Sequence, residues 1–212
     1  MNAVTPLVHV VDDDASVREA LTRLLQVAGH DVRSYASSGE FMLEPLEDRP
    51  GCLVLDVCLP GPNGLDLHDA LRRRERSLPV IFLTGHGDIP MSVRAIKTGA
   101  VDFLTKPVPR ETLLGAIKMA LACDAAMRRA RIAADELNEN YRSLTPRERD
   151  VFQGVVAGKL NKQIAADLGA AERTVKAHRA HVMQKMRASS VADLVRQAQS
   201  LQLAAGSGPT AT

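Results

Sequence analysis

The stretch GCLVLDVCLPGPNG, residues 51–64, is an apolar run that ends on the carboxylate of Asp56 and then breaks into prolines and glycines. A short apolar run bounded by Gly and Pro is typical of a strand buried on both faces. Ligands of open parallel sheets bind beyond the carboxyl ends of the strands. The stretch therefore predicts a strand at Cys52–Val57, with Asp56 either as a binding or reacting group or as a helix cap.

Four further β-like runs occur in the first half of the chain, with helical patterns between them. The runs are Leu7–Asp12, Asp31–Tyr35, Val80–Thr84 and Asp102–Thr105. The clearest helical pattern follows the first run and stops at Gly29. This alternation predicts an α/β fold, in which helices cover both faces of a parallel sheet.

The two halves of the 212-residue chain differ in charge, although the net charge is only +2. Residues 1–123 hold 13 Lys and Arg against 16 Asp and Glu, whereas residues 124–212 hold 14 against 9. An acidic half joined to a basic half favours two domains with different partners, nucleic acid being the partner of the second.

The cysteines and the apolar segments indicate the compartment. Cys52, Cys58 and Cys123 form no CxxC pair and show no zinc-ligand spacing, which is typical of reduced thiols. No apolar stretch approaches the ~20 residues of a membrane span, and the N-terminus has no signal-peptide pattern. We expect a cytoplasmic protein with no membrane partner.

Side chains suited to phosphoryl chemistry follow several of the predicted strands. Asp12 and Asp13 follow the first strand, and Thr84 and Lys106 follow the fourth and fifth. If adjacent strands bring Asp12, Asp13 and Asp56 together, their repulsion favours a bound cation, and oxygen ligands suit Mg²⁺. Asp56 would then attack phosphorus, while Thr84 and Lys106 contact the phosphoryl oxygens.

Taken singly, each of these residues is more often a cap, a turn residue or a surface charge. Asp14 is best interpreted as a helix N-cap. His86 and Asp88 are expected to be ordinary loop residues. A cis bond between Lys106 and the proline after it would aim the lysine ammonium into the pocket.

Four motifs together are more specific than any one residue. They are VVDDD (10–14), LVLDVCLPGPNG (53–64), LTGHGD (83–88) and AVDFLTKP (100–107). In order and spacing they resemble the receiver domain of two-component response regulators, of the FixJ and StyR type, over about residues 5–122. The resemblance implies a flavodoxin-like fold, a doubly wound parallel five-stranded sheet.

The resemblance also implies roles for single residues. Asp56 is the expected phosphoacceptor, with Thr84 and Lys106 as the hydroxyl and cation that act on the phosphoryl group. Thr84 and Phe103 form the expected switch. The expected Mg²⁺ ligands are Asp12, Asp13, Asp56 and the backbone carbonyl of Cys58.

The basic half of the chain shows three helical phrases. Thr145 and Glu148 have capping-box spacing at the start of the first. The second, Lys162–Leu168, ends at Gly169, and a longer helix follows from about Glu172. A short helix, a Gly-containing turn and a longer helix predict a helix-turn-helix unit.

The longer helix carries small alanines between cations on the face opposite its apolar residues, which allows close approach to a DNA groove. Residues 141–199 hold 11 Lys and Arg against 5 Asp and Glu. From spacing alone, a helical bundle with a basic surface remains an alternative to a DNA-binding domain.

Three phrases resemble the LuxR/NarL-type DNA-binding domain over about residues 141–202. They are LTPRERDV (144–151), NKQIAADL (161–168) and RTVKAHRAHVMQKM (173–186). The resemblance implies a four-helix unit whose third helix reads DNA, and Ala170–Ala171 departs from it by lacking the usual Ser cap. The residues expected at the DNA are Arg173, Thr174, Lys176, Ala177, His178, Arg179, Ala180 and Lys185. Among them Lys176, Ala177 and Ala180 are expected to face bases, whereas Thr174, His178 and Lys185, with Asn161 and Lys162, are expected to contact phosphate or brace the fold.

The two resemblances together imply a regulator of transcription that is not an enzyme. A sensor histidine kinase would phosphorylate Asp56, the receiver would form a homodimer, and the second domain would bind double-stranded DNA, with RNA polymerase as a further partner. The expected domains are a receiver (1–122), a helical linker (123–143), a helix-turn-helix domain (144–202) and a disordered tail (203–212).

Two alternatives come from other classes of protein. An aspartyl phosphatase would also use Asp56, but such enzymes need a second acid two residues later, where this chain has Cys58. A phosphorylation-independent DNA-binding regulator would use the receiver as a dimerisation module only, and the complete set of pocket residues argues against it.

Overall fold

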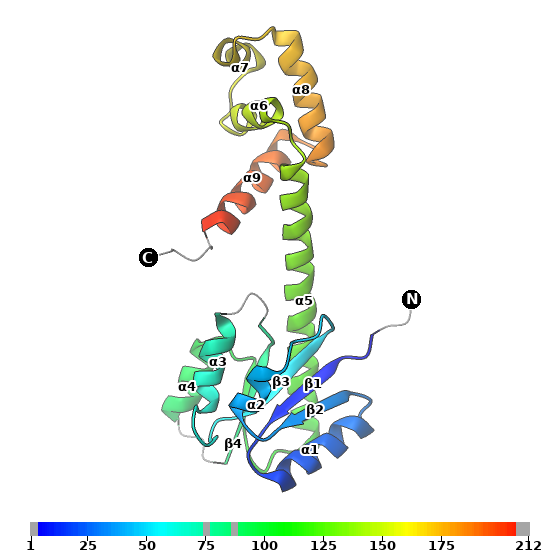
Figure 1. Cartoon of the computed structure of the whole chain (residues 1–212), viewed down its shortest axis with the longest axis vertical. Coiled ribbons are helices and arrows are strands. Elements are labelled where there is room, and N and C mark those ends of the chain that lie inside the picture. Colours follow the sequence, from blue (N-terminus) through cyan, green and yellow to red (C-terminus); the bar gives the residue numbers. More distant parts are fainter. Residues whose placement is uncertain (1–3, 74–76, 86–88, 207–212) are drawn as a thin grey trace. The chain divides into compact units, whose positions relative to one another are not determined.

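The computed structural model describes residues 4–73, 77–85 and 89–206. The chain divides into two compact units, Met1–Met127 and Arg128–Thr212, which we call unit 1 and unit 2 (Figure 1). No helix within the described residues has both the length and the apolar character needed to cross a membrane. His86 and Asp88 lie outside the described residues, and the bounds of the four segments expected from the sequence stay predictions.

In the described part of unit 1, five strands form one parallel sheet in the order β2-β1-β3-β4-β5. The strands are β1 (Leu7–Val11), β2 (Asp31–Tyr35), β3 (Gly51–Asp56), β4 (Val80–Thr84) and β5 (Asp102–Thr105). The predicted fold class is confirmed, and two of the predicted strands end one residue earlier than expected. Asp12 therefore lies just past β1, and Asp56 is the last residue of β3.

Helices cover both faces of this sheet (Figure 1). They are α1 (Ala15–Val27), α2 (Ser38–Leu43), α3 (Gly64–Arg72), α4 (Ile89–Lys97) and α5 (Arg110–Arg142). Side chains alternate between the faces along a strand. On β3, Leu53 and Leu55 join one core cluster, whereas Cys52 and Val54 join the other. Both faces are buried, which explains why the strand is an unbroken apolar run.

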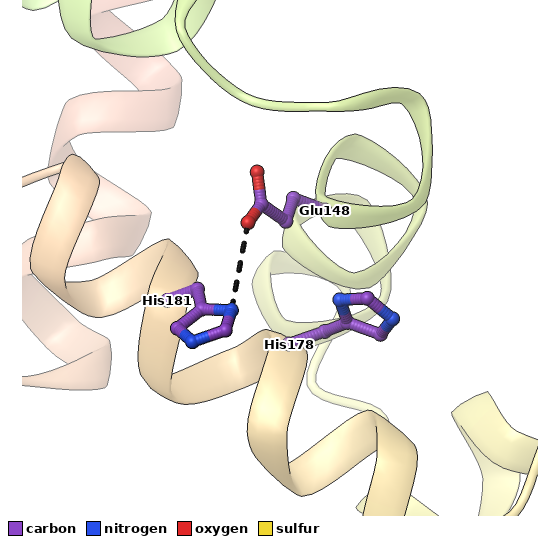
Figure 2. Close-up of side chains that lie close together, drawn as sticks. All are labelled: Glu148, His178 and His181. Atoms are coloured by element: carbon purple, nitrogen blue, oxygen red, sulfur yellow. Dashed lines mark ion pairs between the residues drawn. The ribbon is translucent and has the colours of Figure 1, made fainter.

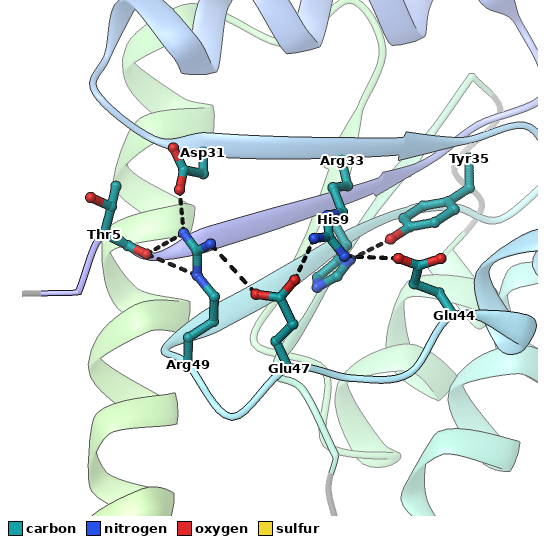
Figure 3. A network of polar contacts seen from close by, with 8 residues as sticks. All are labelled: Thr5, His9, Asp31, Arg33, Tyr35, Glu44, Glu47 and Arg49. Atoms are coloured by element: carbon teal, nitrogen blue, oxygen red, sulfur yellow. Dashed lines mark hydrogen bonds and ion pairs between the residues drawn. The ribbon is translucent and has the colours of Figure 1, made fainter.

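The outer strand β2 is protected by charge rather than by apolar cover (Figure 3). Arg33 on β2 pairs with Glu44 and Glu47, from the segment that follows α2. Arg49 pairs with Asp31 and also donates to the backbone carbonyl of Thr5, two residues before β1. Charged side chains along an edge strand discourage pairing with another chain.

A polar ring pair lies inside this edge of unit 1. His9 is buried, its Nδ1 lies 3.0 Å from the hydroxyl oxygen of Tyr35, and its ring packs against Phe41. Burial, the largest cause, and the nearby Arg33 together lower the pKa of His9 to about 4. His9 is therefore held as the neutral imidazole.

Unit 2 contains four helices within its described residues beyond the end of α5. They are α6 (Pro146–Val156), α7 (Asn161–Leu168), α8 (Glu172–Lys185) and α9 (Val191–Gly206). Their buried side chains, among them Val151, Ile164 and Val182, form a separate core. The helical character of this half is confirmed.

Local signals set the ends of these helices. Thr145 and Glu148 form the predicted capping box at the start of α6, and Gly169 takes the left-handed conformation (φ 60°) that ends α7. In unit 1, Asp14 caps α1 as predicted, accepting from the backbone of Ser16 and Val17.

Two long helices test the expectations for the linker and the tail. The last helix of unit 1 was expected to continue into the linker, and α5 indeed runs to Arg142 as one helix. The tail was expected to be disordered from residue 203, but α9 continues to Gly206, because alanines 204 and 205 are strong helix formers. Residues 207–212 lie outside the described residues.

Candidate functional site

A lysine joins two buried carboxylates at the carboxyl end of the sheet in unit 1. The ammonium of Lys106, just past β5, lies 2.5 Å from Oδ2 of Asp12 and 2.6 Å from Oδ2 of Asp56. The carboxylates of Asp12 and Asp56 are almost fully buried, whereas Lys106 keeps about a fifth of its side chain exposed. Strand order explains why Asp12 and Asp56 meet, because β1 and β3 are neighbours in the sheet, and Lys106 reaches them from the end of β5, on the far side of β4.

A third carboxylate belongs to the same group. One oxygen each of Asp12, Asp13 and Asp56 lies within 4.8 Å of the others, and Asp13 is exposed. We call these three residues with Lys106 the acidic pocket. Three carboxylates with one lysine leave an excess of negative charge, and carboxylate oxygens are the donors that Mg²⁺ prefers. The residues present therefore fit a divalent, oxygen-seeking cation.

Backbone donors hold the buried carboxylates in place. Oδ1 of Asp12 accepts from the backbone N–H of Asp14 at 3.1 Å, and Oδ1 of Asp56 accepts from the backbone N–H of Cys58 at 2.9 Å. The carbonyl of Asp12 accepts from Arg18 on α1 at 2.7 Å. Each carboxylate thus points one oxygen at its own loop and the other at Lys106.

Burial and charge act against each other in the pocket. Burial, the largest cause, raises the pKa of Asp12, although the hydrogen bond and charge of Lys106 act in the opposite direction. Burial alone would lower the pKa of Lys106, but its bonds to Asp12 and Asp56 outweigh that and raise it. The lysine therefore stays protonated between its partners, and the carboxyl of Asp12 is not fully compensated.

A glycine lets the next helix begin close behind the phosphoacceptor candidate. A Cβ placed on Gly64 would lie 2.2 Å from the carbonyl oxygen of Asp56, a distance that no side chain tolerates. The amide of Gly64 donates to the carbonyl of Val57 at 3.1 Å, and Asn63 forms a capping box with Asp66 at the start of α3. The sequence analysis missed this role, although Asn-Gly after an apolar run is the signal that could have shown it.

The switch candidates lie on β4 and β5. Thr84 is fully buried at the end of β4, and its carbonyl accepts from the backbone N–H of Lys106 at 2.7 Å. Phe103 on β5 is half-buried, with its ring centroid 6.3 Å from that of Phe82. The bond between Lys106 and Pro107 is cis. Cys58 has an exposed side chain, and its carbonyl is the part expected to serve a metal.

In unit 2, most of the residues expected at DNA lie on the open surface of α8. Arg173, Thr174, Lys176, Ala177 and Ala180 are exposed. The apolar residues of the same helix, Val175 and Val182, are buried on its other side. The helix therefore presents a basic, small-residue face to solvent, which is the arrangement a major-groove reader needs.

The other three expected DNA residues have partners inside unit 2. Arg179 donates to Oδ1 of Asn161 on α7 at 2.9 Å. Lys185 forms an ion pair with the buried Glu148 at 2.7 Å. His178 is half-buried and lies close to Glu148 and His181 (Figure 2). The contacts of Arg179 and Lys185 orient α8 on α7 and α6. Bracing was one of the two roles expected for Lys185 and Asn161.

The start of α8 shows what the Ala170–Ala171 departure means. Ala171 is the N-cap, with extended backbone and no side-chain hydrogen bond. Its carbonyl still accepts from the backbone N–H of Thr174. The helix begins where the sequence indicated, but without the side-chain cap.

Comparison with known families matches both units. Residues 8–118 match the family described as response regulator receiver domain, and residues 142–198 match the family described as bacterial regulatory proteins, luxR family. The first match covers the acidic pocket and the second covers the surface of α8.

Several relatives match this chain across both units. Nodulation protein W of Bradyrhizobium diazoefficiens is 47% identical over 199 residues, covering 94% of this chain and 88% of that protein. Response regulator protein TodT of Pseudomonas putida is 46% identical over 190 residues, covering 90% and 84%. The structure of the response regulator StyR matches with a TM-score of 0.79 and 45% identity, over 92% of this chain and 99% of that one. The chain therefore belongs to the response regulators that join a receiver domain to a LuxR-type DNA-binding domain.

Proposed function

We propose that Asp56 accepts a phosphoryl group from a sensor histidine kinase and that this step controls transcription. The observation that carries the proposal is the bridge of Lys106 between the buried carboxylates of Asp12 and Asp56. A lysine held beside the nucleophile offers a positive charge to the phosphoryl oxygens as they arrive. The Asp56 oxygen attacks phosphorus, and the bond from phosphorus to the donor's histidine nitrogen breaks.

Asp12, Asp13, Asp56 and the carbonyl of Cys58 are the groups that would hold Mg²⁺. When bound, the ion supplies charge neutralisation between the nucleophile and the phosphoryl oxygens. The excess of carboxylates over cations in the pocket supports this assignment. Hydrogen bonds from the backbone N–H groups of Asp14 and Cys58 hold the carboxylates of Asp12 and Asp56 in their orientation while the charge of the pocket changes.

Thr84 and Phe103 are the proposed switch. Thr84 is the last residue of β4, and its carbonyl accepts from the backbone N–H of Lys106, just past the neighbouring strand β5. From there its hydroxyl can bond a phosphoryl oxygen. Phe103 is half-buried and therefore has a packed and a more exposed position available. A shift of both residues would reshape the surface of α4, β5 and α5, and we propose that this surface forms a homodimer.

The surface of α8 is the proposed reader of double-stranded DNA. Lys176, Ala177 and Ala180 face bases, and Arg173, Thr174, His178, Arg179 and Lys185 contact phosphate or hold the helix in place. A dimer of receivers would place two such helices for two half-sites. RNA polymerase is the further partner through which bound regulator acts, and the cytoplasm is the compartment where kinase, DNA and polymerase meet.

Labelling with acetyl phosphate tests the chemistry. The full chain is incubated with acetyl phosphate in Mg²⁺ or in EDTA, and the product is examined by intact-mass spectrometry. We expect one acid-labile phosphoryl group in Mg²⁺ and none in EDTA or in Asp56→Asn. Asp69→Asn, which changes a partly exposed carboxylate on α3, is the matched control and should label normally.

Light scattering and DNA binding on the same samples test the output. We expect labelled protein to dimerise and to bind its DNA more tightly, and Asp56→Asn to do neither. Labelling without either change would reject the coupling but leave the chemistry standing. Full DNA binding and dimerisation in Asp56→Asn would favour the phosphorylation-independent alternative. Sustained turnover of small phosphate esters would reject the non-enzymatic role.

A further inference from the structure

A second group of metal-ligating side chains lies in unit 2. One ligand atom each of Glu148, His178 and His181 lies within 4.8 Å of the others. Glu148 comes from α6, and the two histidines come from α8 (Figure 2). His178 and His181 are three residues apart, so they occupy the same side of the helix. The sequence analysis gave His181 no role.

The two oxygens of Glu148 are used differently. Oε2 accepts from the ammonium of Lys185 at 2.7 Å and from the backbone N–H of Thr145 at 2.8 Å. Oε1 lies 3.8 Å from Nδ1 of His181. One oxygen is therefore fixed by donors, while the other is turned toward the imidazoles. A ligand carboxylate that is oriented through its second oxygen is a common feature of protein metal sites.

The spacing is close to what one small ion needs. Two ligands at 2.0–2.2 Å from a tetrahedral ion lie about 3.4 Å apart. The ligand atoms here lie within 4.8 Å of one another, so rotations of the imidazoles close the remaining gap. His181 has 60% of its side chain exposed, which gives an ion access and gives the ring freedom to turn.

We propose that Glu148, His178 and His181 bind a divalent transition-metal cation of the Zn²⁺ class, with water in the fourth position. The donor set excludes Mg²⁺ as the preferred ion, because two of the three donors are imidazole nitrogens. Lys185 already balances the charge of Glu148, so binding depends on nitrogen donation rather than on excess negative charge. The fixed carboxylate also stays ionised, since the hydrogen bond from Lys185 and the cap at Thr145 lower the pKa of Glu148 to about 2.

A bound ion would join α6 to α8, the two helices that its ligands come from. Because the unfolded chain does not hold the three ligands together, binding stabilises the folded unit. Metal binding would therefore hold α8, the helix proposed to read DNA, more firmly against α6.

Titration with Co²⁺ tests the site directly, because four-coordinate Co²⁺ absorbs visible light. The full chain is used with Cys58→Ser and Cys123→Ser to remove exposed thiols, and with excess Mg²⁺ to occupy the acidic pocket. We expect one Co²⁺ to bind per chain and to give a visible absorption band. The band should disappear when Zn²⁺ displaces the Co²⁺. His178→Gln and His181→Gln should each weaken binding at least about tenfold. His30→Gln, in unit 1, is the control and should bind as the parent does.

Thermal unfolding gives an independent measurement. We expect Zn²⁺ to raise the unfolding temperature of the parent chain and to leave that of the double variant His178→Gln/His181→Gln unchanged. The histidine variants carry the test because Glu148 also caps α6, so Glu148→Gln alters stability without any metal. The proposal is overturned if no saturable Co²⁺ band forms, or if the histidine variants bind Co²⁺ as tightly as the parent.

Discussion

Each unit contains a buried carboxylate paired with a lysine, and the two pairs are built for different tasks. In unit 1, one lysine serves two buried carboxylates, with a third carboxylate close by. In unit 2, the single carboxylate of Glu148 has Lys185 and a backbone N–H on the same oxygen. The first arrangement is short of positive charge, whereas in the second the charge of Glu148 is already balanced by Lys185.

The pKa values follow this difference. Burial raises the pKa of Asp12 despite the lysine beside it, whereas the hydrogen bonds from Lys185 and Thr145 lower that of Glu148. A carboxylate that is under-compensated attracts a cation by its charge, whereas Glu148, whose charge Lys185 balances, holds two helices together and would bind a metal only with the imidazole nitrogens beside it. Counting donors around a buried carboxylate therefore separates a reactive pocket from a brace, even though both contain the same two residue types.

Replacing each lysine tests the difference between the two pairs and gives the largest expected effect. We expect Lys106→Met to lower the free energy of unfolding of unit 1 by about 3 kcal/mol, because two buried carboxylates lose their counter-charge. Lys185→Met should cost unit 2 only about 1 kcal/mol, because Glu148 keeps the cap bond from Thr145 and Lys185 is partly exposed.

Hydrogen exchange read by mass spectrometry measures these two losses separately, at β3 for unit 1 and at α6 for unit 2. Added Mg²⁺ should recover part of the loss in Lys106→Met, since a cation replaces the missing charge, and should not change Lys185→Met. Equal losses in the two variants would contradict the distinction between the two pairs.

Some of these contacts could be predicted from the sequence and others could not, and the kind of contact decides which. Asp12, Asp56, Thr84 and Lys106 could be assigned to one pocket because parallel strands end at the same edge. The capping box of Glu148 could be predicted because it is local in the chain. Both inferences use short-range patterns or topology.

Contacts between side chains distant in sequence could not be predicted in the same way. The pairing of Glu148 with Lys185 joins residues 37 positions apart, and its partner atom depends on how α8 packs on α6. His9 lies opposite Arg33 in the sheet register, yet it bonds Tyr35, two residues farther along β2. Such pairs are selected by side-chain packing, which the pattern of residue types does not fix.

As the pH falls, unit 1 should begin to lose stability at a higher pH than unit 2. The pKa of His9 is about 4 in the folded chain and about 6.5 when unfolded, so the unfolded state binds more protons between these values. Stability from the neutral His9 is present above pH 6.5 and is lost as pH falls toward 4, by about 3 kcal/mol at most. The pKa of Glu148 is lowered instead, so its contribution is present above about pH 4.5 and is lost only below that.

Unfolding by urea at pH 7 and pH 4.5, again read by hydrogen exchange, measures this order. His9→Gln removes the titrating ring while leaving a side chain that can accept from Tyr35, and it should reduce the acid sensitivity of unit 1. If His9→Gln loses as much stability as the parent chain between these pH values, the effect has another source.

Adding a methyl group at Gly64 should destabilise unit 1 less than Lys106→Met does. It should cost more stability than the same change at Gly154 costs unit 2. In Gly64→Ala the new Cβ meets the backbone oxygen of Asp56, so the loop must move, at about 2 kcal/mol. In Gly154→Ala, on α6, the Cβ meets the buried side chain of Ile164 at 2.8 Å and no backbone atom, so a side chain rather than the main chain must shift.

The better helix propensity of Ala offsets part of that contact in Gly154→Ala, and we expect a change within about 1 kcal/mol. Urea unfolding of both variants gives these values. Gly64→Ala should also slow labelling by acetyl phosphate, because the displaced backbone belongs to Asp56. Normal stability together with normal labelling in Gly64→Ala would contradict the role given to this glycine.

The smallest expected effect concerns the helix start that lacks a side-chain cap. In unit 1, Asp14 caps α1 through two backbone N–H groups, whereas Ala171 offers α8 only its carbonyl. Ala171 already has the extended backbone of an N-cap (φ −74°, ψ 143°), so Ala171→Ser adds an acceptor without moving the chain. We expect a gain of about 1 kcal/mol in unit 2 and slower exchange of the first amides of α8.

Ala170→Ser is the matched control, because a hydroxyl one position earlier is not at the N-cap, and it should change stability by less than about 0.5 kcal/mol. A gain in both variants would mean that added polarity, rather than capping, stabilises this turn. A gain in Ala171→Ser alone would show that α8 begins with an unmet donor. If α8 is the helix that reads DNA, as proposed above, that donor would be open to a phosphate oxygen, because the N-terminal turn of a recognition helix is the part that reaches the groove.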